Sequence, residues 1–193
     1  MKINTVVRVI AAVLAVIWMV RIFSYSSASG EASMQTSRSV CFDIVSSFND
    51  LMHLGWDEDR IQGMSRSIEK IVRKSAHMAE FAVLGILVGT ACDAWRYVGG
   101  LPETSAERAG FRSFLRKSLR GVIAFLICVI YACSDELHQT FVDGRSGEVK
   151  DVIIDVSGAL IAIILMALIL RVVTRHFGHH ANRDQAFRTP GEQ

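Results

Sequence analysis

The sequence lacks the features that mark several large classes of protein. Its formal net charge of +2 is too small to indicate a nucleic-acid partner. It contains no internal repeat and no zinc-binding, P-loop or dinucleotide-binding motif, so we expect no cofactor and no metal. Its 4 cysteines show no CxxC spacing, and most lie in or beside apolar segments. We therefore interpret them as small core residues and not as a disulfide framework.

Long uncharged stretches are also scarce, although 51% of the residues are hydrophobic. A membrane-spanning helix needs ~20 apolar residues, because it rises ~1.5 Å per residue through a hydrocarbon core ~30 Å thick. Four apolar segments are present, and three of them have uncharged stretches shorter than this: Phe81–Cys92, Gly121–Ser134 and Val156–Leu170. Each of the three can cross a bilayer only if it takes charged residues in with it.

The apolar residues are concentrated in blocks, which is typical of an integral membrane protein. The first block could be a signal peptide, but its length and Arg21 near its exit favour a retained helix. We predict an all-α, integral membrane four-helix bundle in a single domain, residues 1–172. The predicted helices are at about 5–24, 73–92, 119–139 and 152–172.

Basic residues set the predicted orientation, since cytoplasmic loops carry an excess of lysine and arginine. The loop 93–118 has a run of basic residues without a matching acidic set, and the tail 173–193 is also basic. Both termini and this loop should therefore be cytoplasmic. The 24–72 loop and the 140–150 connection should be extracytoplasmic. The tail is polar, and we predict that it is disordered.

The 24–72 loop carries two runs of apolar residues at helical spacing. The first is Val40, Ile44, Phe48 and Leu51, and the second is Ile61, Met64, Ile68 and Ile71. This spacing predicts amphipathic extracytoplasmic helices, with Asp57 as the cap of the second. They either lie on the outer membrane face or pack on the bundle.

The charged residues that the spans must include converge in one layer. In an antiparallel series, the start of the second span, the end of the third and the start of the fourth lie on one side of the membrane. Ionisable groups at membrane depth are costly, so their default interpretation is a functional site. The predicted site residues are Lys74, His77, Glu80, Asp135, Glu136, His138, Gln139, Arg145, Asp151 and Asp155.

The helix dipole separates these residues into two kinds. Asp151 and Asp155 suit the helix N-terminus at which they lie. Arg73 and Lys74 lie near an N-terminus, and Asp135 and Glu136 near a C-terminus, where their charges are unfavourable. We expect pairs between these two groups across the helices. Arg145 follows in a short connection above the layer, where an arginine suits a phosphate or carboxylate.

Four interpretations of the layer are open. It is a buried ion-pair network, a site for an anionic lipid headgroup or cell-wall precursor, a catalytic site, or a proton or ion path. The candidate catalytic residues, as acid–base groups or metal ligands, are His77, Glu80, Asp135, His138 and Asp155. Their spacings are common by chance and no Ser or Cys nucleophile motif accompanies them, so we favour binding over an enzyme.

Small residues indicate where the helices approach one another. Gly85 and Gly89 form a GxxxG pattern, and Gly158 gives the fourth helix a similar small face. Such faces allow close backbone approach in membranes, and we predict internal packing here. The sequence leaves the oligomeric state open.

Taken in order, these motifs resemble those of the VanZ-like membrane protein family over about residues 10–172. The motifs are Lys74-Ser75-Ala76-His77 with Glu80-Phe81, then Asp135-Glu136-Leu137-His138-Gln139, then Phe141, Gly144-Arg145, and Asp151 with Asp155 and Gly158. The chain departs at Phe81, where the family often has tyrosine, and at Val142-Asp143. The resemblance implies a four-helix, multi-pass protein of the cytoplasmic membrane and a link to teicoplanin resistance. It implies no mechanism.

Overall fold

The computed structural model describes residues 4–95 and 111–186, without the side chains of 111–118, 174–175 and 177–186. The described residues form five helices and no strand. The helices are α1 (Thr5–Ser26), α2 (Gly30–Leu51), α3 (Glu58–Ala91), α4 (Phe111–Gln139) and α5 (Val149–Ala186). The predicted all-α fold is confirmed for this part of the chain.

Three of the described helices are long and apolar enough to cross a membrane. These segments are Thr5–Ser26, Leu119–Gln139 and Val149–Val173, and most of their residues are not buried inside the protein. Outward-facing apolar side chains on all three fit a bilayer as the surrounding solvent. The apolar half of α3 is less hydrophobic than these three segments, because Lys74, His77 and Glu80 lie at its start.

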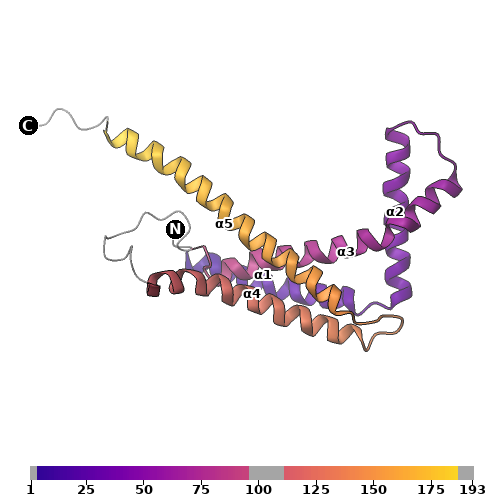
Figure 1. Cartoon of the computed structure of the whole chain (residues 1–193), viewed down its shortest axis with the longest axis horizontal. Coiled ribbons are helices and arrows are strands. Elements are labelled where there is room, and N and C mark those ends of the chain that lie inside the picture. Colours follow the sequence, from indigo (N-terminus) through magenta and orange to yellow (C-terminus); the bar gives the residue numbers. More distant parts are fainter. Residues whose placement is uncertain (1–3, 96–110, 187–193) are drawn as a thin grey trace, which may run out of the picture.

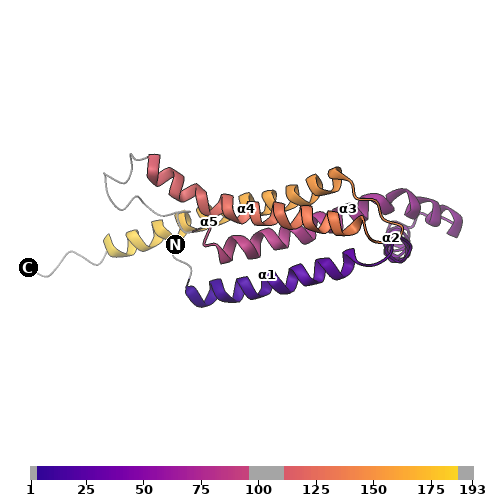
Figure 2. The same ribbon diagram turned by 90° about the horizontal axis from the view of Figure 1, so that it is seen from below.

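Helices α1, α4, α5 and the second half of α3 lie side by side and run in alternating directions (Figures 1 and 2). The α3 helix contacts each of the other four. Large buried side chains such as Ile22, Phe81 and Leu84 pack among small ones such as Ala124 and Ala159. This mixture of sizes lets the helices approach closely while filling the core.

The α3 and α5 helices approach each other closely and meet through glycines. A methyl group at Gly85 would lie 2.8 Å from the carbonyl oxygen of Ala159, and one at Gly158 would collide with the backbone of Met78. Gly89 has a different neighbour, because it packs against the indole of Trp95. Two of the three predicted packing glycines therefore lie at a helix–helix contact.

The α2 helix lies across one end of the other helices, nearly perpendicular to them (Figure 1). Cys41, Val45 and Asn49 on one of its faces are buried, and α2 packs on α3. The apolar run that begins at Val40 is exposed, with Leu51 at 76%. Packing on α3 thus occupies a different face of α2 from the stripe that the sequence marked.

Two helix boundaries differ from the prediction. The amphipathic helix expected in the loop and the second span form one continuous helix, α3, which contains no proline and is capped by Asp57 as predicted. The α5 helix continues to Ala186, where the sequence predicted a disordered tail from 173. No proline interrupts this stretch. Residues 187–193 and most of the basic 93–118 loop lie outside the described residues.

Candidate binding site

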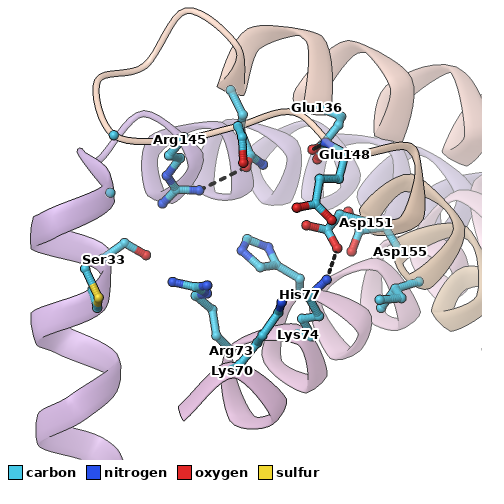
Figure 3. A pocket seen from close by; sticks show the side chains of 16 residues that line it. Ser33, Lys70, Arg73, Lys74, His77, Glu136, Arg145, Glu148, Asp151 and Asp155 are labelled. Atoms are coloured by element: carbon cyan, nitrogen blue, oxygen red, sulfur yellow. Dashed lines mark hydrogen bonds and ion pairs between the residues drawn. The ribbon is translucent and has the colours of Figure 1, made fainter. Parts of the chain in front are cut away.

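A cavity of about 280 Å³ opens at the end of the helices that α2 crosses (Figure 3). Its residues come from the start of α2, the middle of α3, the end of α4, the α4–α5 connection and the start of α5. They are Gly30, Ser33, Met34, Lys70, Arg73, Lys74, His77, Glu136, Gln139, Gly144, Arg145, Ser146, Glu148, Asp151, Ile154 and Asp155. Polar and charged side chains dominate this set.

Seven of the ten predicted site residues line the cavity. They are Lys74, His77, Glu136, Gln139, Arg145, Asp151 and Asp155. The other three, Glu80, Asp135 and His138, do not. Glu80 lies behind His77, with its Oε2 3.4 Å from the imidazole Nδ1. The two groups are close enough for an ion pair when the ring is protonated, although Nδ1 forms no hydrogen bond among the described residues.

Asp135 and His138 contact α1. Asp135 is 2% exposed, and its Oδ2 accepts hydrogen bonds from Ser26 Oγ at 2.7 Å and Gln139 Nε2 at 3.1 Å. His138 Nε2 lies 3.1 Å from Ser27 Oγ, and its ring lies 4.3 Å from that of Phe23. These contacts fasten the end of α4 to the end of α1, which gives both residues a structural role.

The cross-helix pairs differ from those expected. Lys74 Nζ donates to Asp151 Oδ1, joining α3 to α5. Among the described residues, Arg73 pairs only with Glu69, at 3.9 Å within its own helix. Glu136 accepts a 2.6 Å hydrogen bond from the backbone N–H of Glu148. The predicted pairing of Arg73 or Lys74 with Asp135 or Glu136 is therefore wrong, because both carboxylates have other partners.

Arg145 clamps the α4–α5 connection to the end of α1. Its Nε donates to Ala28 O at 3.0 Å, Nη1 to Gln139 Oε1 at 3.2 Å and Nη2 to Tyr25 O at 3.2 Å. Burial lowers the pKa of Arg145, and the nearby charge of Arg73 lowers it further. The guanidinium remains protonated, since an arginine pKa is far above neutral. Much of its donor capacity is already committed to the protein.

We expect Arg145→Lys to lower the free energy of unfolding by about 1–3 kcal/mol, because an ammonium cannot reach three separate acceptors and leaves part-buried oxygen atoms without their donor. Thermal unfolding of purified protein would measure this loss. Arg66→Lys is the control, since Arg66 is exposed and its one hydrogen bond to a described residue is to Gln62 on its own helix. Equal stability of the two variants would argue against the clamp.

Three charged cavity residues were absent from the predicted site: Lys70, Arg73 and Glu148. The signal for the first two was present. Lys70, Arg73, Lys74 and His77 follow at steps of three, one and three, which places them on one face of a single helix. Lys70 lies in the predicted loop helix, outside the predicted second span of 73–92, whereas Arg73 lies inside that span and was expected only to form an ion pair. Glu148 lies in a turn, where no periodicity could indicate it.

Within the described residues, no group of three or more His, Cys, Asp or Glu side chains is arranged to hold a metal ion. The cavity instead holds amines, guanidinium groups, carboxylates and one imidazole. Side chains of this kind recognise charged groups by charge-assisted hydrogen bonds.

Comparison with known proteins places the chain in a family. No curated protein matches it, and neither does any solved structure. The model of the VanZ/LLP1 family matches residues 11–171, which include every residue that lines the cavity. Because this match covers most of the sequence and agrees with the order of the motifs, the chain belongs to the VanZ/LLP1 family.

Proposed function

We propose that this protein is a four-spanning membrane protein of the cell envelope that binds an anionic envelope component in the cavity. The component is a lipid headgroup or a cell-wall precursor, and the binding contributes to glycopeptide (teicoplanin) resistance. The observation that carries the proposal is the pair of basic side chains at the cavity, Lys70 and Arg73. Among the described residues, Lys70 has no ion-pair partner, and Arg73 has only a long contact of 3.9 Å with Glu69.

The α3 helix supplies the fourth span. Its second half runs among α1, α4 and α5 (Figure 2), and polar groups at its start are shielded by protein. Ionisable residues are tolerated at membrane depth when they face a bundle interior and pair with one another. The Lys74–Asp151 pair meets both conditions, since the two side chains pair with each other and are only 25% and 34% exposed, respectively.

The cavity faces outward in the proposed orientation. The α1 helix begins, and α5 ends, at the end of the molecule opposite α2 (Figure 1). If both termini are cytoplasmic, the cavity and α2 lie at the extracytoplasmic surface. Headgroups of the outer leaflet and lipid-linked wall precursors are then within its reach.

Arg73 suits an anion better than the other basic residues of the site. Lys74 is paired with Asp151, and Arg145 is held by three acceptors. Glu69 is bound more closely by Arg38, at 3.2 Å, than by Arg73. The Arg73 guanidinium is 35% exposed and held only by this long contact, so it can form a bidentate contact with a phosphate or carboxylate.

Susceptibility to teicoplanin tests the proposal in a sensitive host that expresses the wild type, Arg73→Gln or His138→Gln at matched membrane levels. We expect the wild type and His138→Gln to protect and Arg73→Gln to lose most of its protection, because only Arg73 lines the cavity. Equal protection by the wild type and both variants would contradict a role for the cavity. If the wild type gives no protection, the proposed link to resistance is wrong.

A further inference from the structure

The cavity separates charges of opposite sign onto two sides. Figure 3 shows Arg73 of α3 on one side and the carboxylates from the end of α4, the α4–α5 connection and the start of α5 on the other, where Lys74 is joined to Asp151. A site that binds a simple anion has no use for a cluster of carboxylates, which repel the ligand. The acidic side therefore needs its own explanation.

Internal pairs account for only part of this charge. Lys74 and Asp151 neutralise each other, and Glu136 accepts the backbone N–H of Glu148. Arg145 is engaged by carbonyl and amide oxygens. These contacts explain the inner polar groups as parts of the fold.

Two charges of each sign remain. The basic wall consists of Lys70, which has no partner among the described residues, and Arg73, whose nearest acid is 3.9 Å away. The acidic wall consists of Glu148 and Asp155, whose carboxylates form no hydrogen bond or ion pair with any described residue. His77 projects between the walls (Figure 3).

Asp155 is the most informative of the four. It is 4% exposed and lines the cavity without a lysine or arginine partner, and the basic group that interacts with it there is the His77 imidazole. A buried carboxylate that accepts no hydrogen bond is costly, so an incoming ammonium group that donates one would gain much of its binding energy there. Glu148 lies at the exposed rim and adds charge of the same sign.

We propose that the ligand is a zwitterion that carries a phosphate or carboxylate together with a protonated amine. This inference rests on the proposed function and narrows its ligand class. The acidic group of the ligand contacts Arg73 and Lys70, and its ammonium contacts Glu148 and Asp155. Aminoethyl phosphate, free or as a lipid headgroup, is the smallest phosphate of this kind.

Binding of phosphoethanolamine to the purified full-length protein in uncharged maltoside micelles tests the inference. Inorganic phosphate and ethanolamine serve as the two half-ligands. We expect phosphoethanolamine to bind about tenfold or more tightly than either half, since each wall supplies at least one charge-assisted hydrogen bond. Arg73→Gln should weaken binding of both phosphoethanolamine and phosphate.

Glu148→Gln distinguishes the walls. It should weaken the binding of phosphoethanolamine about tenfold, because one charge-assisted contact is lost. The binding of phosphate should be unchanged or tighter. Glu31→Gln removes the same charge from an exposed position that does not line the cavity, and should change neither. Glu148 is exposed, so an unchanged unfolding temperature is expected and separates a binding effect from a folding effect.

Added lipids identify the source of the zwitterion. Phosphatidylethanolamine in the micelles, but not phosphatidylglycerol, should compete with phosphoethanolamine if a lipid headgroup is the ligand. Absence of competition assigns the site to a soluble or peptide-borne zwitterion. Equal affinity for phosphate and phosphoethanolamine, with no effect of Glu148→Gln, would overturn the zwitterion and leave an anion site. Binding of neither probe would overturn the proposed function as well.

Discussion

Gly158→Ala should strongly reduce the amount of folded protein, while Gly121→Ala should not. A methyl group at position 158 would collide with the backbone carbonyl of Met78. Because the obstacle is backbone, the two helices must move apart, and no side-chain rotation relieves the contact. We expect a loss of about 3 kcal/mol, the upper part of the usual range for overpacking.

Gly121 gives a matched control. It lies in α4 with nothing within 4 Å of the position of an added methyl group. Alanine is the better helix former by up to ~1 kcal/mol, so Gly121→Ala should leave stability equal or slightly higher. Thermal unfolding in detergent and the level of protein in the membrane would measure both variants. An unchanged unfolding temperature for Gly158→Ala would show that α3 and α5 are not in close contact.

The sequence predicts much of this fold because hydrophobic blocks and helix lengths are local properties. The three apolar spans and the cap at Asp57 follow from composition and spacing alone. The continuity of α3 does not. A change from amphipathic to apolar pattern near Ile71 resembles a boundary between two elements, although no proline or turn separates them.

The sequence does not predict which residues at the end of α4 line the cavity. The end of α4 is polar on more than one face, and its rotation about the helix axis decides which residues reach the cavity. Glu136 and Gln139 line the cavity, while Asp135 and His138 contact α1. Asp135, His138 and Gln139 lie at i, i+3 and i+4, which places them on one face of a helix, and only the packing of α1 against α4 separates them.

Charge reversal at Lys74 and Asp151 tests whether this ion pair stabilises the fold or binds the ligand. Lys74→Asp should destabilise the protein, because it places two carboxylates together between α3 and α5. The expected loss is about 2–3 kcal/mol, which is below the ~3–5 kcal/mol of a fully buried pair. The reduction is expected because both side chains remain partly exposed, at 25% and 34%. Asp151→Lys should have a similar effect.

Combining Lys74→Asp with Asp151→Lys should restore most of the lost stability, since the reversed pair regains its attraction. Only the reversed helix-dipole term remains, because a cation then lies at the N-terminal turn of α5 and costs about 1 kcal/mol or less. Thermal unfolding of the two single variants and the double variant gives the coupling energy directly.

If the pair is structural, the double variant should also bind phosphoethanolamine as the wild type does, because the basic and acidic walls are untouched. Additive losses in the double variant would contradict a direct contact between the two side chains. Recovered stability without recovered binding would instead make Lys74 or Asp151 part of the ligand site.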